Sequence, residues 1–434
     1  MAPNDQQTQE QQPTPKIEQR AGDRAIQIGQ VFGDVVFQLL SPKTAITILV
    51  ALAIAAIGVF YLYNIAQKPD RMTGDFNIAV AQFGEVTDEG IVSSAEVTHI
   101  SKLLFDFLDS EYKATDFGLD IQVAQEKIGI LTEDREAEQL AYDIDADIVI
   151  YGSVSVIGDG DEASLSPKFY VADQPDTGEL TGQHQLALPI KFDISSLGFE
   201  DEVNTKLRSR AATLVCFTEA LVYLSADDLD EALHSFQEAV DEAEGYGTFE
   251  GQEALYLFAA HTNRRQENFE KAEEYLDQAL FLNPEYARAY LARGNIYYVQ
   301  ALPSWDQAKL DKALSEYEKA LEAQDHPAGA YVTEKANTSL GNIYVIQAQQ
   351  TNDPELFARA IDHYDQVVAQ YEKTKNERIR ELAAIAYFGL GAAYERQNDY
   401  TQAADVYQRC IDLTSDSELK SRAERQLSII KDHD

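Results

Sequence analysis

Cysteine is nearly absent from this chain of 434 residues. The two cysteines, Cys216 and Cys410, both fall on the apolar face of a predicted helix and are far apart along the chain. A framework of disulfide bonds is therefore excluded. The cellular compartment stays open, because a cysteine-poor chain suits any compartment.

Basic residues are also scarce. The chain has 35 Lys and Arg against 74 Asp and Glu, a formal net charge of −39. Binding to phosphate groups depends on Lys and Arg, so we expect no nucleic acid and no anionic lipid as the main partner of the soluble part. The acidity either keeps a long helical chain soluble or attracts a basic partner, and we favour the first interpretation.

The motifs of catalysis and of cofactor or metal binding are missing. The chain has no G-x-x-x-x-G-K-[ST] run for phosphates and no G-x-S-x-G turn for a serine nucleophile. Its seven histidines are dispersed, without the spacing that zinc requires. Residues 143–147 begin like a calcium loop, but Ile148 stands where Gly is needed and Val154 where a bidentate Glu is needed. We therefore expect no enzyme, no cofactor and no metal site.

A long hydrophobic run is present near the N-terminus. Residues 45–63 contain no charge, and Lys43 and Lys68 bracket them. As a helix this run would span about 28 Å, close to the roughly 30 Å thickness of the hydrocarbon core of a bilayer. A signal peptide would lie closer to the start and have a shorter apolar core. We therefore predict one transmembrane helix at residues 45–66, anchored in the lipid bilayer.

The residues before this span form a tail. Residues 1–44 are rich in Gln and Pro and carry few large apolar residues until about residue 25, so the tail is expected to be disordered. Residues 25–41 are more apolar. They form either a short interfacial helix or a linker, and both interpretations stay open.

Residues 76–193 alternate between strand and helix patterns. Strands are predicted at residues 76–83, 146–156, 163–171 and 183–192, and helices at 96–112 and 133–144. This order, with the phrase DADIVIYGSV at residues 145–154, resembles the TolB amino-terminal-type α/β domain. The resemblance implies a bacterial envelope or signalling protein. Residues 194–210 are expected to be a linker.

The sequence features that predict the orientation in the membrane conflict. Lys43 lies on the N-terminal side of the span, and Lys68 and Arg71 lie on the other. The positive-inside rule decides little here, because long domains cross membranes largely regardless of their charge. An anchor behind a short tail usually inserts with the tail inside. We expect a single-pass protein of the bacterial cytoplasmic membrane, with its C-terminal domains outside the cytoplasm.

Residues 382–413 carry two helical stripes joined by a turn. Tyr387, Gly391 and Tyr394 lie on the first stripe, and Ala403 and Tyr407 lie on the second. The stretch resembles a tetratricopeptide (TPR) repeat. A glycine inside a helix costs about 1 kcal/mol relative to alanine. Gly391 is therefore expected to permit a close approach of the two helices.

The same pattern recurs along residues 211–418. We predict five such repeats there, followed by a closing helix and tail at 419–434. In two of the repeats the step from the glycine to the second-helix alanine is longer by seven residues, which we place in the inter-helix turn. A single repeat cannot bury its apolar face alone, so the repeats are expected to stack as an all-α solenoid.

The concave face of such an array is the candidate site. We expect Asn295 and Asn342 to face it, with Arg288 and Lys335 earlier on the same helices and Tyr298 later. An Asn side chain there would bind both N–H and C=O groups of a bound backbone. The arrangement partly resembles a carboxylate clamp for a peptide C-terminus. The alternative is that these side chains only solvate the surface.

The predicted fold is multidomain, with one transmembrane helix, a small α/β domain and a TPR solenoid. The predicted function is that of a membrane-anchored scaffold that binds a partner peptide or helix in the groove of its repeats. The alternative is a ligand-sensing or signalling accessory protein that uses its α/β domain as the binding module.

Overall fold

A computed structural model describes residues 69–88, 90–114, 118–157, 162–173, 178–185, 190–193, 216–244 and 251–431. The predicted tail (1–44), the predicted membrane span (45–66) and the predicted linker (194–210) lie outside these residues. No helix among those described is both long and apolar enough to cross a membrane. Pro69–Asp434 forms one compact unit, which holds both the sheet and the repeats.

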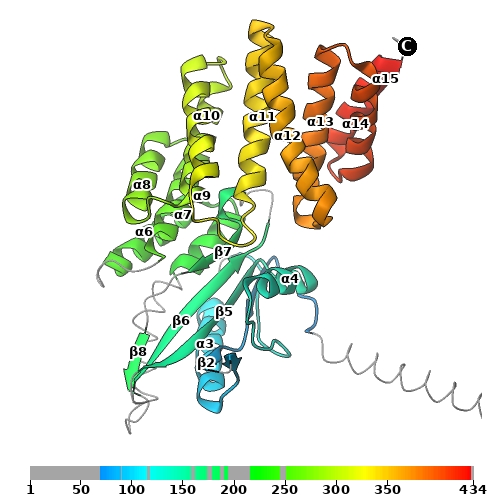
Figure 1. Cartoon of the computed structure of the whole chain (residues 1–434). Coiled ribbons are helices and arrows are strands. Elements are labelled where there is room, and N and C mark those ends of the chain that lie inside the picture. Colours follow the sequence, from blue (N-terminus) through cyan, green and yellow to red (C-terminus); the bar gives the residue numbers. More distant parts are fainter. Residues whose placement is uncertain are drawn as a thin grey trace, which may run out of the picture. The chain divides into compact units, whose positions relative to one another are not determined.

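A mixed β-sheet forms the N-terminal part of this unit (Figure 1). Five strands lie in the order β3-β2-β5-β1-β4: β3 (Gly90–Val92), β2 (Gly84–Thr87), β5 (Ile148–Ile157), β1 (Phe76–Val80) and β4 (Ile121–Ala124). β5 pairs with β1 and β2 in parallel. Its other partner is the antiparallel β6 (Glu162–Val171), which also pairs with β7 (Gly182–Gln185) and β8 (Ile190–Asp193).

Both faces of the central strands are covered by helices. Phe76, Ile78 and Val80 pack in one apolar cluster with α3 (Ala95–Ala114). The intervening Ala79 belongs to a second cluster with α4 (Asp134–Ile144). A strand that is buried on both faces has to be a continuous apolar run. This requirement explains why the sequence pattern located β1 and β5.

The repeats are built from α-helices that pack in consecutive pairs. Their bounds are α6 (Leu229–Glu244), α7 (Gln252–Arg265), α8 (Phe269–Leu282), α9 (Ala287–Ala301), α10 (Gln307–Glu322), α11 (Val332–Thr351), α12 (Pro354–Thr374), α13 (Arg380–Arg396), α14 (Tyr400–Leu413) and α15 (Ser417–Lys431). Residues 216–225 are also helical and precede α6. The predicted all-helical C-terminal half is confirmed.

In the three repeats whose first helix carries a glycine, a tyrosine ring of the second helix packs against that glycine. A Cβ atom added at Gly294 would lie 2.5 Å from Tyr317, and one at Gly391 would lie 2.5 Å from Tyr407. Real Cβ atoms essentially never come this close to another heavy atom. The predicted reason for the glycines, a close approach of the paired helices, is therefore confirmed, and the group that approaches is a tyrosine ring.

The seven extra residues of two repeats are not confined to the turn. In the repeat of α11 and α12 the turn is only Asn352 and Asp353, and the helices themselves are 20 and 21 residues long. By comparison, α14 has 14 residues. Seven residues are about two helical turns. The extra residues lengthen the end of α11 and the start of α12, which corrects the predicted placement in the loop.

The apolar core of the sheet continues into the first repeats. Phe169 of β6 lies 4.7 Å from Phe217, measured between ring centroids. Phe217 lies at the same distance from Phe258 of α7, which in turn contacts Phe236 of α6. These aromatic rings belong to one buried cluster that joins β6, the helix at residues 216–225, α6 and α7. The sheet and the first repeats therefore share one core.

Candidate functional site

Three first helices carry equivalent side chains on one face. His261 of α7, Asn295 of α9 and Asn342 of α11 each follow the small residue that packs against the second helix. We call the surface of α7, α9 and α11 that carries these three residues the first-helix face. His261 and Asn295, at the same repeat position, both contact the carboxylate of Glu179.

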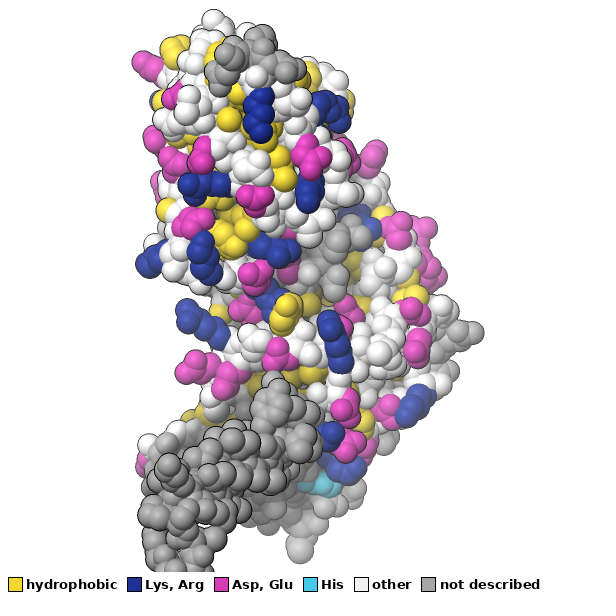
Figure 2. All heavy atoms as spheres, turned by 90° about the vertical axis from the view of Figure 1, so that its right-hand side faces the viewer, with side chains coloured by type: hydrophobic (Ala, Val, Ile, Leu, Met, Phe, Trp, Pro, Cys, Tyr) yellow, Lys and Arg dark blue, Asp and Glu magenta, His cyan; other side chains and the backbone are white. Residues whose placement is uncertain are grey.

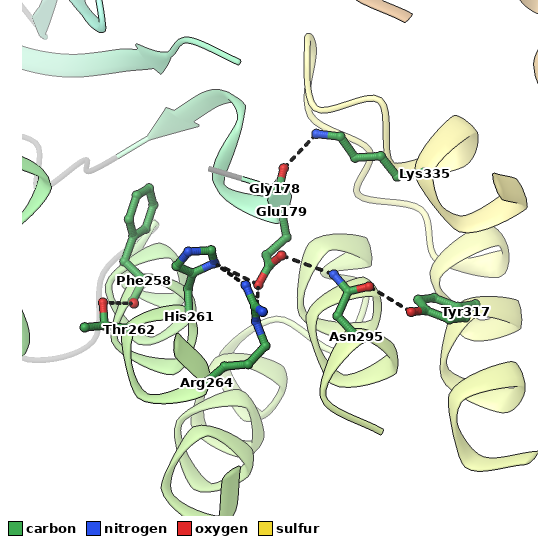
Figure 3. A network of polar contacts seen from close by, with 9 residues as sticks. All are labelled: Gly178, Glu179, Phe258, His261, Thr262, Arg264, Asn295, Tyr317 and Lys335. Atoms are coloured by element: carbon green, nitrogen blue, oxygen red, sulfur yellow. Dashed lines mark hydrogen bonds and ion pairs between the residues drawn. The ribbon is translucent and has the colours of Figure 1, made fainter. Parts of the chain in front are cut away.

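A segment of the chain's own N-terminal part lies on this face (Figures 1 and 3). The segment comprises Gly178–Gln185, made of the short 3-10 helix η1 (Gly178–Leu180) and strand β7, and we call it the strap. The η1 turn packs against α7 and α9. The amide of Gln183 donates to the carbonyl of Ala328, 2.9 Å away in the connection between α10 and α11.

The carboxylate of Glu179 is the most buried charge of the strap (Figure 3). Its side chain is 1% exposed. Its Oε1 atom lies 3.0 Å from Nδ1 of His261 and 3.5 Å from Nε of Arg264. Its Oε2 atom accepts a hydrogen bond of 3.2 Å from Nδ2 of Asn295. Donors from two first helices therefore converge on one carboxylate.

The surroundings keep this carboxylate ionised. Burial alone would raise the pKa of Glu179, but the charge of Arg264 and the contact with His261 outweigh it and hold that pKa well below its usual range. Burial also lowers the pKa of His261, despite the neighbouring carboxylate. The imidazole is therefore neutral at pH 7 and donates its Nδ1–H to Glu179, so the balancing charge comes from Arg264.

The backbone of the strap is held by two cations of the array. Arg288, which is 1% exposed, donates from Nη2 to the carbonyl of Thr181 at 2.6 Å and from Nη1 to that of Gln183 at 2.7 Å. Lys335 donates from Nζ to the carbonyl of Gly178 at 2.7 Å. A buried charge requires such partners, and each of these carbonyls is satisfied by a charge-assisted hydrogen bond.

His184 fixes the other end of the strap. Its ring stacks on Phe169 at 5.0 Å between centroids, and its Nε2 lies 2.6 Å from the carbonyl of Leu180. Nη1 of Arg288 lies 2.9 Å from its Nδ1. Burial and the charge of Arg288 keep the pKa of His184 well below its ordinary value. The ring is therefore neutral, donating through Nε2 and accepting through Nδ1.

A second contact joins the sheet to the array at α4. Glu138 of α4 lies 3.6 Å from Nε of Arg378 and also accepts a hydrogen bond from the hydroxyl of Tyr331. The guanidinium of Arg378 lies 4.2 Å from the ring centre of Tyr142. The sheet therefore contacts the array at two separate places, the strap and α4.

Of the five predicted groove residues, three contact the strap: Arg288, Lys335 and Asn295. Asn295 also accepts a hydrogen bond of 2.8 Å from Tyr317. Asn342 accepts one of 2.7 Å from Tyr364, and Tyr298 is half-buried against the apolar core of the later repeats. That these residues bind a separate ligand remains a prediction. Sequence reasoning missed Glu179, His261 and Arg264, although His261 occupies the same repeat position as Asn295.

A cavity of about 330 Å³ lies beside the strap. Its walls are the residues of β7, the start of α7, and residues around the beginning and end of the α9–α10 pair. Arg288 and Glu253 are among them, and burial raises the pKa of Glu253. In the part of the chain that the structure describes, no group of three or more His, Cys, Asp or Glu side chains could hold a metal ion.

Lys335 makes the free energy of unfolding depend on pH. Burial lowers the pKa of Lys335 from 10.5 to about 8. Between these values the unfolded chain binds more protons than the folded one, so the contribution of this residue to stability rises with pH. We expect the difference in unfolding free energy between wild type and Lys335→Met to shift in favour of wild type from pH 8 to pH 10. A difference that does not change over this range would contradict the assignment.

The comparisons with known proteins agree with the repeat geometry. The family model for the tetratricopeptide repeat matches residues 257–304 and 355–418. It covers no part of residues 76–193, so the resemblance of that segment to TolB-type domains remains a prediction. No curated protein matches this chain.

Several solved structures are similar to part of the chain. Yeast Tom70 is 18% identical over 55% of this chain and 44% of its own, with a TM-score of 0.40. YrrB, described as a TPR protein with an unusual peptide-binding site, is 15% identical over 51% of this chain and 96% of its own, with a TM-score of 0.32. The first TPR of Spaghetti (RPAP3), bound to an HSP90 peptide, is 24% identical over 32% and 95%, with a TM-score of 0.25. The family match and the helix pairs lead to one conclusion: the C-terminal half of this chain carries tetratricopeptide repeats.

Proposed function

We propose that the chain is a membrane-anchored scaffold that binds an extended segment of a partner protein on the first-helix face of its repeats. Repeats of this family act as interaction modules through the extended surface that stacking creates. The observation that carries the proposal is the strap itself. Its backbone carbonyls and its single carboxylate are held by donors from α7, α9 and α11. A partner segment would need the same acceptor groups, backbone carbonyls and a carboxylate.

We place one part of the partner segment on the face beyond the strap. Asn342 of α11 occupies the repeat position of Asn295 in the next repeat. Its Oδ1 accepts from Tyr364, and within the described part of the chain its Nδ2 donates to no other residue. The side chain is therefore held in a fixed orientation while its donor remains available, as recognition of a backbone carbonyl requires.

The anchor and the location belong to the same proposal. The uncharged run at residues 45–63 supports a single membrane span, and we place the repeats outside the cytoplasmic membrane of a bacterium. Figure 2 shows acidic and basic side chains interspersed on the face that it views, with apolar side chains between them. A mixed surface of this kind suits a protein partner better than nucleic acid.

A photo-crosslinking experiment tests the proposed surface. A photoreactive amino acid at Asn342 of the full-length chain is expected to give a discrete adduct with one partner protein in native membranes, because this position lies on the first-helix face. The matched control places the same amino acid at Glu318, an exposed position on the second helix α10. Equal adducts at both positions, or none at Asn342, would contradict the proposal.

A second candidate function is the sensing of a small molecule. It is favoured by the cavity of about 330 Å³ beside the strap, whose size suits a small ligand. The cavity is lined by both β7 and the repeats, so a ligand there would contact the sheet and the array together.

A further inference from the structure

We infer that the first-helix face contains a carboxylate subsite occupied by Glu179, and that an acidic residue in an extended segment of the partner displaces Glu179 from it. The inference rests on the proposed function and deepens it, because it assigns a chemistry to the partner. It also makes the strap an internal competitor for the site.

The subsite is built by the array alone. His261 and Arg264 come from α7, and Asn295 comes from α9. If Glu179 left, these three donors would stay in place and the charge of Arg264 would face a vacated, largely buried site. A buried charge without its partner is strongly unfavourable. The site therefore requires a carboxylate, but nothing in its geometry requires that this carboxylate belong to Glu179.

Leu180 of the η1 turn is fully buried in the apolar cluster that joins the sheet and the first repeats. The other contacts of the strap beside this turn are made to its backbone. Lys335 donates to the backbone carbonyl of Gly178, and Arg288 donates to that of Thr181. Every peptide presents such carbonyls. A partner would therefore need one acidic side chain, an apolar side chain next to it in place of Leu180, and an extended backbone around them.

The two ends of the strap are held differently. β7 is paired with β6 over four residues, from Gly182 opposite Val171 to Gln185 opposite Lys168. The η1 turn before it makes no strand pairing and is bounded by two glycines with positive φ, Gly178 at 45° and Gly182 at 100°. Glycine adopts this backbone region without a steric penalty. We place the change of path in this turn, with β7 staying in the sheet. The displaced group is the turn that carries Glu179.

This arrangement sets how a partner would compete. β7 tethers Glu179 beside the subsite, so its effective concentration there is high. The apparent affinity for an external carboxylate is reduced by the fraction of molecules whose subsite is empty. Weakening Glu179 should therefore strengthen binding of an external segment without altering the subsite.

The test uses a labelled, end-capped peptide with the sequence of residues 178–185, GELTGQHQ, and the full-length chain. Glu179→Gln is nearly isosteric and removes the charge of the internal competitor. By fluorescence anisotropy we expect this variant to bind the peptide at least about tenfold more tightly than wild type does. A control peptide with Gln in place of Glu should bind neither protein.

Each outcome decides the inference. Equal binding of the peptide to variant and wild type, or equal binding of the two peptides, would overturn it and leave the strap as a fixed structural element. If Glu179→Gln does not fold, the binding measurement is replaced by hydrogen exchange of the strap amides in wild type. Added GELTGQHQ should accelerate that exchange and the Gln peptide should not; unchanged exchange would overturn the inference. Neither result depends on the crosslink at Asn342, so the proposed function can stand or fail separately.

Discussion

Glu179→Ala is expected to lower the free energy of unfolding by about 3 kcal/mol. Removing one member of a buried ion pair leaves the other charge uncompensated, which typically costs about 3 to 5 kcal/mol. We take the lower end because the side chain of Arg264 is 21% exposed and water can reach part of it. Urea denaturation of the full-length chain, followed by circular dichroism, measures the change.

Two controls separate this effect from a general loss of acidic charge. Glu318→Ala removes an exposed carboxylate from α10 and should change stability by less than about 0.5 kcal/mol. The pH dependence is the second control. The pKa of Glu179 is lowered from 4.5 in the folded chain, so its contribution is fully present above pH 4.5 and is lost as pH falls towards the folded value. A loss of less than about 1 kcal/mol at pH 7 would show that the carboxylate is not paired with Arg264 and His261.

Gly341→Leu is expected to destabilise the array by at least about 2 kcal/mol. A Cβ at this position would lie 2.6 Å from the ring of Tyr364, and one at Gly389 on α13 would lie 2.3 Å from the same ring. The ring therefore lies between glycines of two successive repeats. It is 1% exposed and its hydroxyl is bound to Asn342, so it cannot move aside. Overpacking of such a core typically costs about 1 to 3 kcal/mol.

The smaller substitution Gly341→Ala tests whether helix propensity or steric overlap with the tyrosine ring dominates. Alanine in a helix interior is favoured over glycine by about 1 kcal/mol, so helix propensity alone would make this variant more stable. We expect net destabilisation, because the added methyl group meets the ring. Gly129→Ala is the control, since a Cβ there would meet nothing within 4 Å. A rise in the melting temperature of Gly341→Ala would contradict the tight contact.

The repeats could be predicted from the sequence because their signature is local. Gly391 and the Tyr407 that packs on it are only 16 positions apart, and the same pattern returns along the chain. The long buried strands were predictable for a similar reason, since each is a continuous apolar run. The hairpin of β2 and β3 was missed, because strands of four and three residues carry too little alternation to be recognised.

The strap contact could not be predicted in this way. Glu179 is one of 74 acidic residues, and no spacing connects it to His261 or Asn295. Arg288 was predicted as a groove residue and contacts the strap, and periodicity cannot tell whether such a side chain meets solvent, a partner or the chain itself. A weak signal did exist. His261 occupies the repeat position of Asn295 and Asn342, which marks it as a member of the same row.

The strap also determines when this protein can finish folding during its synthesis. The residues that hold it are made much later than the strap itself: His261 follows Glu179 by 82 positions, and Lys335 follows Gly178 by 157. Ribosomes add about 5 to 20 residues per second, so the turn waits roughly 8 to 30 seconds for Lys335 to be made. The partners of Glu179 are made earlier, since His261 follows it by 82 positions and Asn295 by 116. Docking of the strap thus requires that the first helices of three successive repeats have been translated.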